Sequence, residues 1–516
     1  MISNAFMPLS RKESDMMLPT AATYYPNLAT LDSNSKGGLL DWIRYPARRK
    51  HLFRIMVFCG LVGCWIYIRQ HGASDTQEMQ GWDIPNLTVG KAEVSVPKND
   101  PQHSPISVTV PTSKTANNLI KGLVPLEKNS ANLTIHSVLG EEAENAYVYG
   151  SRTLEDYYNS LSTFVDLATP QYLRSKLRNS LKRYTDNRHP RLFLREGPDR
   201  LPGLGEEAGT RNIWQTDANS EHEESEPVAS WKNNDEGWQW KLLNDADASR
   251  YVATTLDGSR LKNVWDLLPS GILHSDMLRY LLLLLEGGIY SDTDTKRLKP
   301  ISNWSNKARL WHEGRGWLYG NSTGLDLEPM EGVEVDDLAS PSVVVGIEAD
   351  VGDRQDWHDW WPRPVQIVQW TISSTPYHPI ALDVIRHITH QTAEALEWQQ
   401  QRPRRIKTLL QAGEIDEAER LKQATILSEP KAGGPVGVMN WTGPGVWTDA
   451  VLRYLRVKFG VQWTDLKDLQ EPLRVGEVLI LPVTGFSPGV GLFGAKSPFD
   501  EDAMVEHLFA GSWKGS

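Results

Sequence analysis

A run of apolar side chains at residues 277–285, broken only by one arginine and one tyrosine, constrains the fold of this chain more than any other feature. A helix that is apolar around its circumference must be buried on most faces. Ser275 before the run is a good N-cap, and Gly287 and Gly288 after it end the helix. Ile289 and Tyr290 then start a short extended segment. The sequence therefore predicts a buried helix followed at once by a strand, which is typical of an α/β domain.

Two aspartates, Asp292 and Asp294, follow this predicted strand directly. Residues two apart in an extended segment point the same way, so both carboxylates are expected on one side. Paired carboxylates suit Mn²⁺ or Mg²⁺, and such an ion neutralises the diphosphate that leaves a nucleotide sugar. An isolated Asp-x-Asp is a weak signal, but here a buried helix and a glycine turn hold it at the edge of a core. We therefore predict a metal-assisted site at Asp292 and Asp294.

Asp276 and Arg279 lie three residues apart at the start of the apolar helix. They have two interpretations of about equal weight. One is a local ion pair whose carboxylate also favours the helix N-terminus. The other is that both side chains point into the cleft of the predicted metal site and bind sugar hydroxyls.

A second apolar segment, residues 52–69, stands near the N-terminus. Basic residues gather before it, whereas only Arg69 follows before the first acidic residues. The positive-inside rule then keeps the N-terminus in the cytosol and places the rest of the chain in a lumen. Its strictly uncharged part, residues 55–68, is short for a membrane span, so a buried core helix is the alternative. We expect a single-pass type II signal anchor at residues 52–69.

Composition divides the rest of the chain into three parts. Residues 1–51 are expected to form a cytosolic tail. Residues 70–189 are expected to form a polar lumenal stem that ends in a helical lead-in, residues 152–186. Residues 190–516 are expected to form the catalytic domain.

The expected catalytic domain contains helical and strand-like segments in alternation. Helical spacing recurs within residues 380–427, and short apolar strand candidates lie at 343–347 and 478–483. Two acidic stretches without a period, residues 221–226 and 326–337, are expected to be surface insertions. This pattern again predicts an α/β domain.

Charge and cysteine content exclude other classes of protein. The net charge of -11 argues against general nucleic-acid binding. The two cysteines both lie within the apolar N-terminal segment, so no intrachain disulfide or zinc–thiolate site is expected after it. The chain has 20 tryptophans, which either fill the core or stack on sugar rings.

The segment SDMLRYLLLLLEGGIYSDTDT, residues 275–295, resembles the signature of glycosyltransferase family 32. Within that family it is most similar to the fungal initiation-specific α-1,6-mannosyltransferases of the Golgi. The resemblance extends from about residue 190 to the C-terminus. Further blocks match in the same order: NIWQT (212–216), VGIEAD (345–350), VQWTI (368–372), VMNWTGPG (438–445), FSPGVG (486–491) and HLFAGSW (507–513).

The resemblance implies a GT-A fold, which is a Rossmann-like α/β domain that binds a nucleotide sugar. It also implies GDP-mannose as the donor, Mn²⁺ (or Mg²⁺) as the metal, and transfer with retention of configuration. Asp292 and Asp294 match the family's metal and diphosphate motif. Asp276 and Arg279 match its contacts with the donor sugar. Retention requires either a covalent intermediate or attack from the same face, and the residues leave both open.

Candidate donor and metal contacts outside this motif come from the same resemblance. His507 is a candidate for a further metal or diphosphate ligand, and a structural histidine is the alternative. Two blocks supply residues expected to hold the nucleotide or to shape a loop over the donor: Trp214, Gln215, Gly443, Pro444 and Gly445. Glu348 and Asp350 lie in another block, where they would either position the acceptor or stabilise positive charge.

The implied acceptor is an N-linked glycan of a glycoprotein, extended by α-1,6-linked mannose at the Golgi membrane. Association in a mannosyltransferase complex is compatible with this expectation. The acidic insertions depart from the family pattern and leave the acceptor and linkage open. Alternatives are a relative with another donor or acceptor (galactosyl or sphingolipid mannosyl) and a non-catalytic lumenal glycan-binding protein. A phosphatase of the haloacid-dehalogenase type also uses Asp-x-Asp, but Lys296 stands where it needs threonine or valine.

Overall fold

The computed structural model describes residues 113–126, 153–186, 195–196, 200–311, 338–351, 357 and 361–510. A central mixed sheet has the strand order β2-β1-β3-β8-β6-β10-β9-β5, and β7 pairs with β6 at the side. Parallel pairs join β1 to β2 and β3, β6 to β10, and β5 to β9, whereas the other pairs are antiparallel. The strands are β1 (Asn212–Thr216), β2 (Gln239–Leu243), β3 (Gly288–Ser291), β5 (Arg309–Leu310), β6 (Val343–Asp350), β7 (Val365–Ile367), β8 (Thr371–Ser374), β9 (Leu473–Val475) and β10 (Val478–Leu481).

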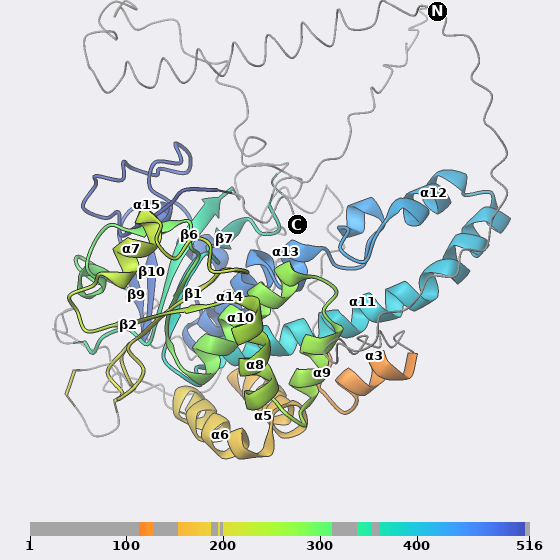
Figure 1. Cartoon of the computed structure of the whole chain (residues 1–516), viewed down its shortest axis with the longest axis horizontal. Helices are drawn as coiled ribbons and strands as arrows, with labels where there is room; N and C mark the ends of the chain where they lie inside the picture. The colour runs from red at the N-terminus through yellow and green to blue at the C-terminus, as the bar shows by residue number, and fades with distance from the viewer. Residues whose placement is uncertain are drawn as a thin grey trace, which may run out of the picture. The chain divides into compact units, whose positions relative to one another are not determined.

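Helices cover this sheet, which confirms the predicted α/β class. In Figure 1, α10, α11 and α14 lie to the right of the strands, and α7 and α15 lie over their left part. α10 contacts β1, β3 and β8, and α14 contacts β7. The helices are α3 (Ser113–Ile120), α5 (Leu154–Ala168), α6 (Gln171–Asp186), α7 (Glu226–Lys232), α8 (Asp245–Thr255), α9 (Arg260–Leu267), α10 (Gly271–Leu285), α11 (Pro379–Ala412), α12 (Ile415–Gln423), α13 (Val438–Trp441), α14 (Pro444–Phe459) and α15 (Val483–Phe486).

The predicted helical stretch 152–186 forms two helices, α5 and α6, that pack on the helices next to the central sheet. Both contact α11, and α5 also contacts α9 and α14. Ser180 Oγ donates to the carbonyl of Tyr377 at 2.9 Å, and the hydroxyls of Tyr184 and Thr375 lie 2.9 Å apart. These contacts tie the lead-in to the chain just before α11. The predicted domain boundaries, including the one at residue 190, stay predictions.

The buried helix is present as predicted, but it begins one turn earlier. Ser270 is the N-cap, and its side chain accepts from the backbone N–H of Leu273. The prediction that Ser275 caps the helix is wrong, because Leu273 is already buried in the first turn and the helix extends to cover it. Every residue from 276 to 285 is buried, as the nearly continuous apolar run requires.

Gly287 and Gly288 allow the chain to reverse between α10 and β3. Both have positive φ, 69° and 106°. A Cβ on Gly288 would lie 2.2 Å from the carbonyl oxygen of Asn212 on the neighbouring strand β1. A side chain here would therefore combine backbone strain with a steric clash.

Gly288→Ala is expected to lower the free energy of unfolding by about 3 kcal/mol, because strain and overpacking act together. Gly271→Ala is the matched control, since Gly271 opens α10 at an exposed position with no atom within 4 Å of its Cβ. The control should keep the wild-type melting temperature or gain slightly. Equal melting temperatures for the two variants would contradict the role given to Gly288.

Four tryptophans, Trp231, Trp304, Trp441 and Trp447, are fully buried. Trp231 and Trp304 meet edge to face, and Trp304 also packs on Phe486 of α15. Part of the tryptophan content therefore builds the core.

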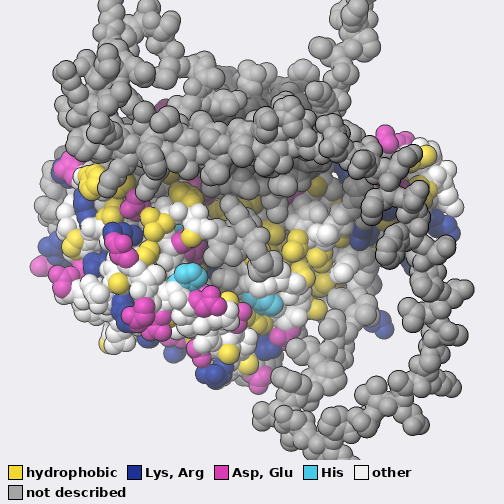
Figure 2. Space-filling model, turned by 45° about the horizontal axis from the view of Figure 1, so that its top comes forward, with side chains coloured by type: hydrophobic (Ala, Val, Ile, Leu, Met, Phe, Trp, Pro, Cys, Tyr) yellow, Lys and Arg dark blue, Asp and Glu magenta, His cyan; other side chains and the backbone are white. Residues whose placement is uncertain are grey.

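The acidic stretch 221–226 is a surface turn that leads into α7. Glu223 and Glu224 pair with Lys232, and Glu226 pairs with Lys296. Figure 2 shows the same mixture of acidic and basic side chains over the described surface of the face it draws. The prediction of a surface element is confirmed here, whereas the second acidic stretch, 326–337, lies outside the described residues.

The predicted anchor, residues 52–69, also lies outside the described residues. Among the helices that the structure describes, none combines the length and the apolar character that crossing a membrane requires. The anchor therefore stays a prediction from the sequence.

Candidate functional site

Asp292 and Asp294 lie in a turn immediately after β3. The expectation that they continue an extended segment is wrong, because β3 ends at Ser291 and the chain turns through residues 293 and 294 before β4 (Thr295–Arg297). Thr295 closes the turn with its backbone N–H and its hydroxyl, which donate to the carbonyl of Asp292 at 3.1 and 2.6 Å. The two carboxylates converge through this turn rather than through strand alternation.

His507 completes a cluster with the two aspartates. It lies on β11 (Val505–His507), which pairs antiparallel with β4 and places His507 opposite Thr295. One ligand atom from each of Asp292, Asp294 and His507 lies within 4.8 Å of the others. This is the one such group of three that the described part of the chain contains.

The C-terminal chain holds Asp294 through several contacts. His507 Nε2 lies 3.3 Å from Asp294 Oδ1, and the N–H of Ala510 donates to Oδ2 at 3.0 Å. The N–H of Leu508 donates to the carbonyl of Asp294 at 2.9 Å. Burial favours the neutral acid, but the interaction with His507 outweighs it and lowers the pKa of Asp294. Asp294 is therefore a carboxylate at neutral pH.

A divalent cation fits this cluster. Two carboxylates and an imidazole form a donor set that Mn²⁺ accepts, and Mg²⁺ prefers the carboxylates. Among the described residues, the buried Nδ1 atom of His507 has no hydrogen-bond partner, and Nε2 is the ring nitrogen that faces Asp294. The residues present thus match the predicted metal site, although its ligand roles stay predictions.

Arg279 connects the helix α10 to the metal cluster. Its guanidinium lies 2.9 Å from Asp276 Oδ1 and 3.2 Å from Asp292 Oδ1, and it donates to the carbonyl of Gln369 at 3.1 Å. It also lies over the ring of Tyr290, 4.6 Å from the centroid. The local ion pair proposed for Asp276 and Arg279 is therefore present, and it is directed at the metal cluster. Contact with a sugar stays a prediction.

The two aspartates that pair with Arg279, Asp276 and Asp292, both have raised pKa values. Burial raises the pKa of Asp276 to about 6, although Arg279 and the hydroxyl of Thr442, which donates at 2.8 Å, favour the charged form. Burial also raises the pKa of Asp292, and the nearby charge of Asp294 adds to the effect. Such clustering of perturbed carboxyl groups is typical of functional sites.

Trp214 and Gln215 support the site from β1. Gln215 Nε2 donates to the carbonyl of Asp292 at 3.1 Å, and its oxygen accepts from Trp240 Nε1 at 2.8 Å. Trp214 is buried, and its Nε1 donates to the carbonyl of Gly287 at 2.9 Å. The structure thus brings Gln215 to the turn that carries Asp292 and Asp294, and Trp214 to the glycine turn that precedes β3.

Gly443, Pro444 and Gly445 form the start of α14 beside α10. Gly443 is the N-cap, and Pro444 and Gly445 are buried in the first turn. The preceding carbonyl, that of Thr442, accepts from Tyr280 Oη at 2.9 Å and from Gln369 Nε2 at 3.0 Å. This segment is therefore held next to Asp276, and its contact with a donor stays a prediction.

Trp370 is a site residue for which no role was predicted. Its ring stacks on His507, with centroids 4.4 Å apart and 16° between the planes. Its carbonyl accepts from the N–H of Asp292 at 2.8 Å, and its Nε1 donates to the carbonyl of Phe486 at 3.2 Å. Its sequence block, VQWTI, carried part of the family resemblance, but nothing local in it pointed to His507.

Trp370→Leu is expected to weaken Mn²⁺ binding by about tenfold or more, because residues that orient metal ligands contribute on this scale. Trp370→Phe keeps an aromatic ring beside His507 and should lie closer to the wild type. Mn²⁺ affinity measured by electron paramagnetic resonance checks both variants. A leucine variant that binds Mn²⁺ as tightly as the wild type would exclude this role.

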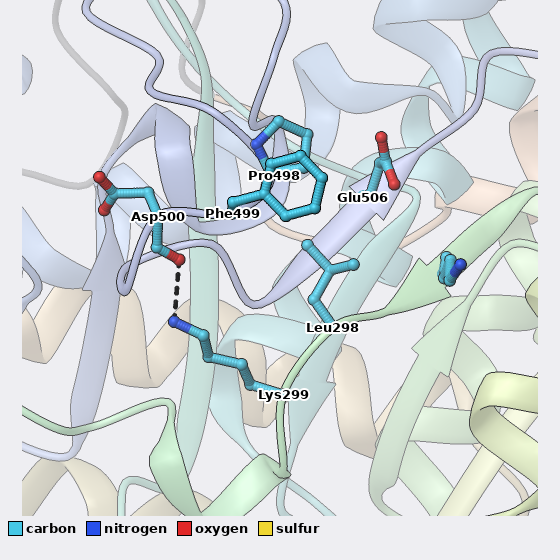
Figure 3. Close-up of a pocket in the computed structure, with 7 residues that line it drawn as sticks. Leu298, Lys299, Pro498, Phe499, Asp500 and Glu506 are labelled. Atoms are coloured by element: carbon cyan, nitrogen blue, oxygen red, sulfur yellow. Dashed lines mark hydrogen bonds between the residues drawn. The ribbon is translucent and has the colours of Figure 1, made fainter. Parts of the chain in front are cut away.

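The outer face of the β4–β11 pair carries a pocket of about 460 Å³. Figure 3 shows Pro498 and Phe499 on one side of it and Leu298 on the other, and Lys299 donates to the carbonyl of Asp500 at 2.9 Å. Its remaining lining residues are Lys296 and Glu506, which lie opposite one another in the strand pair. The next pair of opposed residues along the two strands is Thr295 and His507.

Comparisons with known proteins agree with this geometry. Residues 220–311 match the family described as "glycosyltransferase sugar-binding region containing DXD motif". An "initiation-specific alpha-1,6-mannosyltransferase" of Schizosaccharomyces pombe is 35% identical over 307 residues, which are 58% of this chain and 63% of that protein. Proteins of the same description from Candida albicans and Saccharomyces cerevisiae are 31% and 27% identical. The match to the Candida protein covers 59% of this chain and 72% of that protein. The match to the Saccharomyces protein covers 74% of this chain and 94% of that protein.

Proposed function

Because this chain belongs to glycosyltransferase family 32, the family with the DXD-containing sugar-binding region that includes the initiation-specific α-1,6-mannosyltransferases of fungi, we propose that it transfers mannose from GDP-mannose. The acceptor is an N-linked glycan, the new linkage is α-1,6, and the configuration is retained. The observation that carries the proposal is the cluster of Asp292, Asp294 and His507, with Arg279 beside it.

The proposed metal is Mn²⁺ or Mg²⁺, held by Asp292, Asp294 and His507. When bound, it supplies positive charge that neutralises the departing GDP diphosphate. Arg279 holds Asp292 in place and adds a fixed positive charge at the same edge of the sheet. Burial disfavours the charged guanidinium, but Asp292 and the other nearby groups outweigh it and raise the pKa of Arg279, so this charge is permanent.

Asp276 is the proposed contact with the donor sugar. Its two oxygens already engage Arg279 and Thr442, so its position is fixed before a ligand arrives. Such preorganised groups cost little reorganisation during reaction. The mixed sheet, with the aspartate pair directly after β3, is compatible with the GT-A arrangement that we propose for the domain.

We place the enzyme at the Golgi membrane as a single-pass type II protein with a lumenal catalytic domain. The basic flank before residues 52–69 supports this orientation. The names of the fungal relatives support the linkage, and the family resemblance supports the acceptor class.

The test uses full-length protein in detergent with GDP-mannose, Mn²⁺ and a mannose-terminated N-glycan. We expect transfer that stops on chelation, returns with added Mn²⁺, and yields an α-1,6 linkage on mapping of the product. Hydrolysis of GDP-mannose without transfer would support the donor and contradict the acceptor. No turnover or binding of GDP-mannose by folded protein would contradict the mannosyltransferase proposal and favour another donor or a glycan-binding role.

A further inference from the structure

Glu348 occupies a β-bulge at the same edge of the sheet as the metal cluster. In the pairing of β6 with β7, Ile347 lies opposite Ile367 and Ala349 opposite Gln366, so Glu348 is the extra residue. A bulge leaves its extra residue outside the ladder and re-aims its side chain, and bulges are common next to active sites. Glu348 is partly exposed, although its neighbours Ile347 and Ala349 are buried.

A short stretch of chain connects this bulge to the metal cluster. It begins at Gln366, opposite the bulge, and its Val368 donates to the carbonyl of Gly346 at 2.9 Å. It ends at Trp370, whose carbonyl accepts from Asp292 N and whose ring stacks on His507. The five residues from Gln366 to Trp370 are four steps along the chain, which span at most about 14 Å. The bulge and the metal site are therefore near neighbours along one edge.

The side chains at the bulge have unused hydrogen-bonding groups. Glu348 has one hydrogen-bond partner among the described residues, Gln366 Nε2 at 2.7 Å, and no cation pairs with it there. The other end of that amide, the buried Gln366 Oε1, has no hydrogen-bond partner within the described part of the chain. Burial raises the pKa of Glu348 to about 7, against the smaller effect of the hydrogen bond from Gln366.

A purely structural role does not account for the pair of Glu348 and Gln366, as a comparison with another carboxylate shows. The structural carboxylate of Glu477 is fully buried and lies among Lys458, Tyr454 and His378. Glu348 is only partly exposed and has no such compensation among the described residues, and a carboxyl that loses part of its contact with water without gaining a cation is costly. A ligand that donates hydrogen bonds would supply the missing contacts.

We infer that Glu348, held in place by Gln366, forms a subsite that binds a hydroxyl group of the acceptor sugar. The inference rests on the proposed function and names where its acceptor is held. A sugar hydroxyl can donate to the partly exposed Glu348 carboxylate, whereas the fully buried Gln366 orients that carboxylate through its amide. The chain between the bulge and Trp370 then sets the distance of the acceptor from the metal cluster. Glu348 orients the acceptor, and no proton transfer is assigned to it.

The test measures glycan binding separately from donor binding in full-length protein. Titration calorimetry with a mannose-terminated N-glycan oligosaccharide, and separately with GDP plus Mn²⁺, is applied to Glu348→Gln and Gln366→Met. Each variant should bind the oligosaccharide about tenfold more weakly, which is the scale of a lost charge-assisted hydrogen bond. Binding of GDP with Mn²⁺ should change less than about twofold by the same scale.

Glu286→Gln is the matched control. Glu286 is also partly exposed and also accepts one hydrogen bond, from Tyr251 Oη at 3.1 Å. It caps the C-terminal end of α10, at the opposite edge of the sheet from Asp292. This variant should bind both ligands as the wild type does.

Each outcome decides the inference. Unchanged oligosaccharide binding in both bulge variants, or equal loss of oligosaccharide and GDP binding, would overturn it. So would a wild type that binds GDP with Mn²⁺ but not the oligosaccharide. Failure of mannose transfer by the wild type would count against the proposed function, and the oligosaccharide titration would still test the subsite.

Discussion

Asp292→Asn and Asp294→Asn are each expected to lower kcat/KM for sugar transfer by at least about 10³-fold. Both carboxylates belong to the cluster with His507, and Lewis-acid stabilisation of a leaving group contributes several kcal/mol to a reaction. Mn²⁺ affinity should fall in parallel with the rate. Transfer rates and metal titrations on the same preparations measure the two effects.

The two substitutions should differ in their effect on stability. Asp292 faces the buried Arg279 and accepts from Tyr290 Oη at 2.8 Å, so its neutralisation leaves a buried cation less well compensated. Asp294 is held mainly by the partly buried His507 and by the exposed residues that follow β11. We expect the melting temperature to fall more for Asp292→Asn than for Asp294→Asn.

Asp266→Asn serves as the control, because this exposed aspartate pairs, among the residues that the structure describes, only with Lys262 on its own helix. It should leave the rate and the metal affinity unchanged. Full activity in either of the two site variants would exclude the metal-site assignment. Lost activity with unchanged Mn²⁺ affinity would move the role of that aspartate from metal binding to substrate binding.

The local part of the site could be predicted because it lies within one short stretch of sequence. A nearly continuous apolar run predicts a buried helix whatever its neighbours are, and the glycine pair predicts the reversal before β3. The prediction failed at the start of α10, because Ser270 and Ser275 are both good capping residues and only burial of Leu273 selects the first. It also failed at the aspartate pair, where contacts of Thr295 impose a turn.

The convergence of distant segments could not be derived from local patterns. His507 reaches Asp294 because β11 pairs with β4, and nothing in either three-residue strand specifies its partner. The resemblance to a family nominated His507, whereas Trp370 was missed, because its stacking on His507 depends on the order of strands in the sheet. Long-range strand pairing is thus the step that sequence patterns leave open.

Glu477→Gln is expected to lower the free energy of unfolding by roughly 3 kcal/mol at neutral pH. Glu477 and Lys458 are fully buried, and their Oε1 and Nζ atoms lie 2.7 Å apart. Tyr454 also donates to Glu477, and His378 Nε2 lies 3.8 Å away. Removal of the carboxylate takes from the buried Lys458 the negative charge that faces its Nζ atom, which is strongly destabilising. The double variant Glu477→Gln/Lys458→Met should recover much of the loss, because it removes both charges.

The same cluster predicts how stability depends on pH. Burial opposes ionisation, but Lys458 and His378 outweigh it and lower the pKa of Glu477 from 4.5 to about 2. A depressed carboxyl pKa contributes stability that is complete above the unfolded value and is lost as the pH falls through the folded value. Between pH 4.5 and about 2, the wild type should therefore lose stability more steeply than Glu477→Gln. Melting temperatures across this range check the slope, and parallel curves for the two proteins would show that Glu477 is not ionised in the folded state.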